Sequence, residues 1–401
     1  MDASARIGKV DMPVSSLREA LKNLLNTVTP NLWNNHQGNQ DCPRVIALVN
    51  WDNLGDFVLF TAVIRETRTN YPDSKLIVVA QKENSEIVGE CDLVDRWIWI
   101  KGHRKPKAGM GHGRETSYWT RLIKTYFVLL FLGKRQVDLL IGPDWLLVNN
   151  PKQFTSNFLF AKGNRELKAL KEVTQRNTVQ YLNHAHQVTR MLSVLRMFGL
   201  VTLSDEIENW MPSNPVTHQI YSGESMALGR PNILISLGAG QARRSWPHSY
   251  VDELVKKLVQ IYPGIVITII GPKSLISVET DELFMGSKNL VNLIGKTDLS
   301  NIVWLMKRTD MLVSNDSGLI HIASSLKLPT VVVSSHPLNG DPWHLNSPNR
   351  YHPWKTRFVC LQPEKLLDDC SNSCRSKQAH CIKSITPDQV LSACSQLITG
   401  I

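Results

Sequence analysis

The chain has 401 residues, of which 42% are hydrophobic and 20% are charged. This composition excludes a disordered or collagen-like protein, and the length is enough for more than one buried core. The net charge of +10 favours an anionic partner, such as a phosphorylated lipid, a membrane surface, a nucleotide or a nucleic acid. The first residues show no secretory pattern, and the most apolar run, residues 126–132, is far shorter than the ~20 residues of a membrane span. We therefore expect a cytoplasmic protein.

In chain order, residues 1–42 predict an N-terminal appendage, with leucines at helical spacing followed by a polar stretch. A second pattern begins at Arg44, where residues 44–50 are an uninterrupted apolar strand and residues 57–72 a helix that Pro72 ends. Further strands are predicted at residues 74–81, 97–100 and 137–142. This alternation predicts a parallel sheet with crossover helices, so we assign residues 43–215 to a first Rossmann-like domain.

A polar, turn-rich stretch up to residue 230 links the first domain to a second one. Residues 231–401 repeat the alternation, with apolar strands near 232–236, 265–271, 311–315 and 330–335 and an amphipathic helix at 249–263. The fold class is therefore α/β, with two doubly wound domains facing a central cleft. Ligands of such folds bind at the carboxyl ends of the strands, so we expect the chemistry in strand-to-helix loops.

In the first domain, such a loop carries Gly55 and Asp56 directly after a buried strand. Glycine permits a tight turn and a close approach to a ligand. Asp56 fits two interpretations equally well: it caps the following helix, or it is a general base that takes a proton from an acceptor hydroxyl.

Two loops of the second domain have the residues that a diphosphate needs. Gly238 and Gly240 offer backbone N–H groups, and Arg243 and Arg244 follow them. The sharper pattern lies between a strand and a helix and consists of Asn315, Asp316, Ser317, Gly318 and His321. A helix N-terminus with small polar residues binds phosphate, although a plain capping loop would have the same composition.

Two other clusters each have a structural alternative. The basic loop at residues 101–114, with Arg104, Lys105 and Lys107, either grips an anionic acceptor or is a solvated surface. It has no nucleic-acid motif, so we expect no nucleic-acid partner. Cys360, Cys370, Cys374 and Cys381, with His380 adjacent, either hold a structural zinc or iron ion or are reduced thiols.

Together these motifs resemble glycosyltransferase family nine, the ADP-heptose:lipopolysaccharide heptosyltransferases. The resemblance covers roughly residues 44–395. It rests on the Gly55–Asp56 pair, on Arg244 two residues before Trp246-Pro247, and on the signature N-D-S-G-x-x-H that ends at His321. The cysteine tail, followed by I-x-P-x-x-V, is similar as well.

The resemblance implies a GT-B fold and an inverting transfer of heptose from ADP-heptose. Asp56 would be the base, Arg244 would stabilise the departing diphosphate, and Asp316 to Gly318 with His321 would hold the donor. No metal would be required for catalysis, and peripheral contact with the inner membrane is expected. The acceptor is lipopolysaccharide core or, in a related branch, a bacterial surface protein. A nucleotide-sugar epimerase and a non-catalytic binding module remain alternatives. The turn after residue 335 and the N-terminal appendage depart from the family pattern.

Overall fold

In the computed structural model the described residues are 43–50, 52–88, 91–100, 139–142, 158–161, 185–197, 202–207, 231–275, 289–342, 344, 346–367, 370 and 374–399. The N-terminal appendage, the basic loop at residues 101–114 and the polar linker after residue 207 lie outside these ranges. No helix among the described residues is long and apolar enough to cross a membrane.

The first lobe is built on one sheet of strand order β3-β2-β1-β4-β5. Its elements are β1 (Val45–Asn50), α2 (Leu54–Asn70), β2 (Lys75–Gln81), η1 (Lys82–Ile87), β3 (Arg96–Ile100), β4 (Leu139–Gly142), β5 (Phe158–Ala161) and α6 (Gln187–Met197). β1 pairs in parallel with β2 and β4, as the uninterrupted apolar runs predicted. β5 pairs antiparallel with β4 and was not predicted.

The second lobe has the strand order β11-β10-β9-β6-β7-β8, all parallel. Its strands are β6 (Asn232–Ser236), β7 (Val266–Ile270), β8 (Leu290–Asn292), β9 (Met311–Asn315), β10 (Thr330–Val333) and β11 (Phe358–Leu361). Its helices are η5 (Ala242–Arg244), α8 (His248–Ile261), η6 (Lys273–Leu275), α10 (Leu299–Met306), α11 (Gly318–Ser325), α12 (Pro348–Tyr351), η7 (Cys381–Ser384) and α13 (Pro387–Ile398). This is the 3-2-1-4-5-6 order of a dinucleotide-binding fold, so the doubly wound prediction is confirmed.

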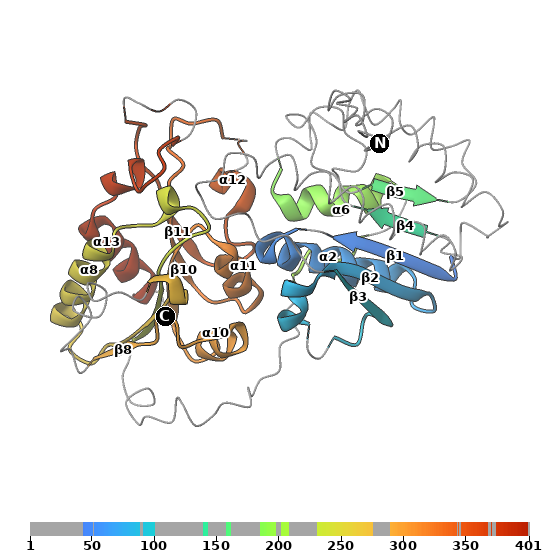
Figure 1. Ribbon diagram of the computed structural model, residues 1–401, viewed down its shortest axis with the longest axis horizontal. Coiled ribbons are helices and arrows are strands. Elements are labelled where there is room, and N and C mark those ends of the chain that lie inside the picture. Colours follow the sequence, from blue (N-terminus) through green and yellow to red (C-terminus); the bar gives the residue numbers. More distant parts are fainter. Residues whose placement is uncertain are drawn as a thin grey trace, which may run out of the picture.

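The two lobes lie side by side, and α2 and α11 meet at their boundary (Figure 1). One apolar core runs through that boundary, from Phe57 and Phe60 on α2 to Trp304 on α10 and Ile322 on α11. A second core covers the other face of the second sheet, between α8 and α13. The shared core fixes the two lobes against each other.

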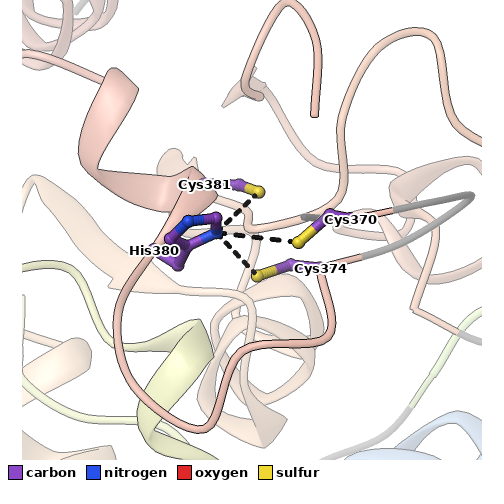
Figure 2. Close-up of side chains that lie close together, drawn as sticks. All are labelled: Cys370, Cys374, His380 and Cys381. Carbon is purple, nitrogen blue, oxygen red and sulfur yellow. Dashed lines mark hydrogen bonds between the residues drawn. The ribbon is translucent and has the colours of Figure 1, made fainter. Parts of the chain in front are cut away.

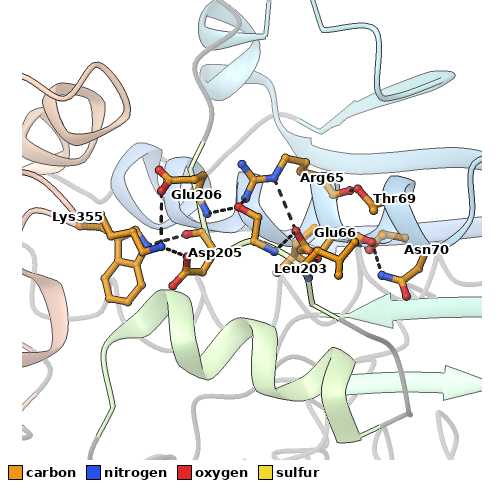
Figure 3. Close-up of polar contacts among 12 residues, drawn as sticks. Arg65, Glu66, Thr69, Asn70, Leu203, Asp205, Glu206 and Lys355 are labelled. Carbon is orange, nitrogen blue, oxygen red and sulfur yellow. Dashed lines mark hydrogen bonds and ion pairs between the residues drawn. The ribbon is translucent and has the colours of Figure 1, made fainter.

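A polar connection adds to this core. The buried carboxylate of Glu66 on α2 accepts hydrogen bonds from the backbone N–H groups of Leu203 and Ser204, at 2.7 and 3.0 Å (Figure 3). The next residues reach the second lobe, because Asp205 and Glu206 form ion pairs with Lys355. Residues 202–207 therefore connect α2 to the second lobe through hydrogen bonds and ion pairs.

Candidate functional site

The site lies where the two helix N-termini meet. α2 follows β1 and α11 follows β9, and each of these strands is at the point where its sheet reverses strand order. A Cβ atom on Gly55 would lie 3.0 Å from Cδ2 of His321 and 3.1 Å from Cα of Gly318. Only glycine permits this approach, and it brings two positive helix ends to one place. An anion is the ligand that such a place favours.

Asp56 lies in the first turn of α2. The helix begins at Leu54 with Asn53 as its N-cap, so the interpretation of Asp56 as the capping residue is wrong. Burial and, second to it, the like charge of Asp52 raise the pKa of Asp56 from 3.8 to about 7, against the opposing effect of the Arg350 cation. The carboxyl therefore exchanges its proton near neutral pH, which suits a general base.

Arg244 and Asp316 form an ion pair beside this carboxyl. Nη2 of Arg244 lies 2.7 Å from Oδ2 of Asp316 and also donates to its backbone carbonyl. Burial raises the pKa of Asp316, and Arg244 opposes that rise. Nε of Arg244 is buried and has no hydrogen-bond partner among the described residues. An anionic ligand would satisfy that donor.

His321 lies on α11 and is buried. Burial, together with the nearby charges of His352 and Arg244, lowers its pKa to about 3, so the imidazole stays neutral. Its Nδ1 atom is buried and finds no hydrogen-bond partner in the described part of the chain. A neutral imidazole has one donor and one acceptor nitrogen, and both phosphate oxygens and sugar hydroxyls can use them.

The remaining residues of the signature shape the loop. The amide of Asn315 accepts from the backbone N–H of Trp246 at 2.8 Å and donates to the carbonyl of Gly238 at 3.1 Å. Ser317 is the N-cap of α11, and Gly318 is its first residue. Through these two hydrogen bonds Asn315 connects the loop after β9 to the loop after β6.

The two glycines of the loop after β6, Gly238 and Gly240, have different roles. Gly238 has a φ of +81°, a left-handed conformation that favours glycine. Gly240 has open space around the position of a Cβ. Arg243 is partly exposed on η5. The loop thus offers room for a ligand beside Gly240.

Arg350 is a site residue that the sequence did not indicate. It is buried, its Nε and Nη2 donate to Oε1 of Gln187 at 3.1 and 3.0 Å, and its charge acts on Asp56. Gln187 begins α6 of the first lobe, so Arg350 bridges the lobes. The available signal was position: α12 follows β10, and segments after the carboxyl ends of parallel strands form the ligand sites of such folds.

The predicted acceptor residues Arg104, Lys105 and Lys107 lie outside the described residues.

The cysteine prediction needs one correction. Cys370, Cys374, His380 and Cys381 form a group that could hold a metal ion, with all ligand atoms within 4.8 Å of one another (Figure 2). Cys360 is not in that group. It lies on β11, paired with Val332, and this fixed strand position keeps it out of the loop that contains the other ligands.

Comparison with known proteins agrees with this architecture. The family model of glycosyltransferase family 9 (heptosyltransferase) matches residues 148–376. The chain belongs to glycosyltransferase family 9. Its Haemophilus ducreyi relative, lipooligosaccharide heptosyltransferase 2, is 31% identical over 181 residues, which cover 42% of this chain and 48% of the relative. The matched part thus spans about half the length of that curated relative.

Two solved structures have the same fold. A family 9 glycosyltransferase of Veillonella parvula matches with a TM-score of 0.59 and 16% identity over 91% of this chain and 100% of its own. E. coli heptosyltransferase WaaC with ADP matches with a TM-score of 0.53 and 15% identity, over 88% and 99%. The GT-B prediction is confirmed, and family membership argues against the epimerase alternative.

Proposed function

We propose that this family 9 protein is an inverting glycosyltransferase that moves heptose from ADP-heptose to an acceptor hydroxyl. The observation that carries the proposal is Asp56: a carboxyl with a pKa of about 7 that faces Arg244, Asp316 and His321 across the boundary between the lobes. The base on α2 and the leaving-group cation on η5 thus come from different lobes.

The roles follow from the charges. Asp56 removes the proton of the acceptor hydroxyl as that oxygen attacks the anomeric carbon. Arg244 and the N-terminus of α11 stabilise the negative charge that develops on the departing diphosphate. The neutral His321 holds the donor with a hydrogen bond. Attack from the side opposite the diphosphate inverts the anomeric carbon.

Arginine and helix N-termini supply the charge stabilisation, so this reaction needs no catalytic metal. We propose that the ion which the cysteine–histidine group could hold, zinc or iron, is structural.

The proposed acceptor is the lipopolysaccharide core. Support comes from relatives named as lipooligosaccharide and lipopolysaccharide heptosyltransferases. The net charge of +10 also suits an anionic glycolipid. We place the protein in the cytoplasm with peripheral contact to the inner membrane, and we propose that Arg104, Lys105 and Lys107 bind the acceptor.

A donor and acceptor panel tests the proposal. The full chain is incubated with ADP-heptose or other nucleotide sugars, together with a lipid A–Kdo acceptor or a bacterial surface protein, and nucleotide release is measured. We expect ADP release only with ADP-heptose and the glycolipid, reduced about 10²- to 10⁴-fold in Asp56→Asn. The matched control is Asp73→Asn, an exposed carboxylate in the turn after α2.

Release with the surface protein alone would move the acceptor to the protein branch. Absence of release from every donor would leave a binding module, and full activity in Asp56→Asn would refute the role of the base.

A further inference from the structure

The loop between β11 and α13 brings three thiols around one imidazole nitrogen. Nδ1 of His380 lies 3.6 Å from Sγ of Cys370, 4.0 Å from Sγ of Cys374 and 3.4 Å from Sγ of Cys381 (Figure 2). Cys374 and Cys381 are buried, and all three cysteines are free. One nitrogen cannot make three good hydrogen bonds at once, so hydrogen bonding alone does not account for this convergence.

The distances are those of a tetrahedral metal site. Zinc lies about 2.3 Å from thiolate sulfur and about 2.0–2.1 Å from imidazole nitrogen. Tetrahedral angles then separate sulfur from nitrogen by about 3.5 Å and two sulfurs by about 3.8 Å. The separations of 3.6 Å for Cys370 and 3.4 Å for Cys381 match that sulfur–nitrogen value, and the 4.0 Å of Cys374 is longer. Three cysteines and one histidine complete four-coordination and leave no open position, which is the composition of a structural zinc site.

The loop is connected to the proposed diphosphate site through one tryptophan. Cys381 begins η7, and the carbonyl of Ile385 just after η7 accepts a hydrogen bond from Nε1 of Trp246 at 2.9 Å. The backbone N–H of Trp246 donates to Asn315. Trp246 is buried and stands two residues after Arg244. Whatever fixes η7 therefore also fixes the segment that carries Arg244.

The same loop leads into α13. Thr386 and Gln389 form a capping box at the start of that helix, and α13 packs against α8 and the second core. The loop between β11 and η7 has few apolar side chains, and its described residues from 374 to 380 are mostly exposed or half-buried. Apolar packing therefore does little to fix this loop. A cross-link by a metal would hold it where packing does not.

We propose that Cys370, Cys374, His380 and Cys381 bind one zinc ion, which clips the C-terminal tail against Trp246 and so positions Arg244. The binding of zinc stands on the ligand geometry alone. The effect on Arg244 rests on the proposed function, since it assumes that Arg244 binds the donor diphosphate.

The first experiment measures metal content in the full chain purified without added metal or chelator. Elemental analysis is expected to find one zinc per chain in the wild type and in Cys394→Ser, the matched control for a buried thiol of α13 outside the group. Cys374→Ser is expected to contain several-fold less. Iron in place of zinc would overturn the metal assigned, and a wild type without metal, or with metal that Cys374→Ser retains, would overturn the site.

A second experiment does not depend on the variant folding. Wild-type protein stripped of zinc is titrated with Co²⁺, and we expect the intense visible absorption of a tetrahedral cobalt–thiolate centre, saturating at one equivalent. A weak octahedral spectrum would overturn the site.

The third readout is the binding of ADP to zinc-loaded and stripped protein. We expect the Kd for ADP to rise several-fold on stripping, whereas an unchanged Kd would overturn the link to Arg244. If zinc is present but ADP binds neither form, the metal site stands and the proposed function fails.

Discussion

The raised pKa of Asp56 predicts that this carboxyl destabilises the protein as the pH rises. Its pKa is 3.8 when unfolded and about 7 when folded, so between these values the unfolded chain has lost the proton and the folded chain has kept it. Unfolding then releases a proton, and stability falls by about 1.4 kcal/mol per pH unit. The full loss reaches about 4 kcal/mol above pH 7. This value is an upper limit, because the Asp56 side chain is only half-buried by its accessible surface.

Asp56→Asn removes this titration while keeping the shape of the side chain. Urea unfolding of wild type and variant at pH 5 and pH 9 measures the effect. The wild type should lose about 2–3 kcal/mol more than the variant over that interval. The two proteins should converge below about pH 3, where the carboxyl is protonated in both the folded and the unfolded chain. The control Asp73→Asn should follow the wild type throughout.

If wild type and Asp56→Asn show the same pH dependence of stability, Asp56 does not have a raised pKa in the folded protein, because a carboxyl with an ordinary pKa contributes no such slope. A variant that is more stable yet inactive would show that Asp56 lowers the stability of the protein while it is required for activity.

Substitutions of Arg244, Gly55 and Arg350 test the site further. Arg244→Ala should slow transfer about 10²- to 10³-fold and should also destabilise the fold, because it leaves Asp316 unpaired. Arg244→Lys keeps the charge and should recover part of the rate. If both variants lower kcat equally, the charge of Arg244 has no role in the transfer. Gly55→Ala should reduce kcat/KM about tenfold or more, because its Cβ would lie 3.0 Å from His321 and 3.1 Å from Gly318 of the other lobe. Gly240→Ala, whose Cβ meets nothing within 4 Å, should not, and equal kcat/KM in the two variants would contradict the need for this close approach. Arg350→Gln should move the acid limb of the pH–rate profile upward by about one unit, because the cation lowers the pKa of Asp56; an unmoved limb would contradict that contact.

The elements predicted best are those in which local sequence and burial agree. β1, β6 and β9 are uninterrupted apolar runs because both faces of a parallel strand are covered, and their lengths are visible in the chain. The residues after these strands were recognisable as site candidates, because ligands of such folds bind at the carboxyl ends of the strands, and the strand order places those ends together. β5 was missed because four apolar residues do not tell a strand from a buried helix segment.

The parts that were missed depend on contacts between distant residues. Arg350 becomes part of the site only because it meets Gln187 and Asp56, which are 163 residues and nearly 300 residues earlier in the chain. Similarly, the spacing of the cysteines did not reveal that Cys360 is fixed in a strand and that His380 takes the fourth place. The raised pKa of Asp56 has the same origin, since it comes from burial between two lobes.

The proposed function depends on Asp56 acting as the base of a heptosyl transfer. The most direct measurement is the pH dependence of kcat/KM for ADP release from ADP-heptose, from pH 5 to pH 9, with saturating glycolipid acceptor. We expect the wild-type rate to rise with an apparent pKa near 7 and then level off, because ionised Asp56 is the active form. In Asp56→Asn we expect a low rate that does not depend on pH. A rate that is independent of pH in the wild type, or the same rising limb in Asp56→Asn, would contradict this role of Asp56.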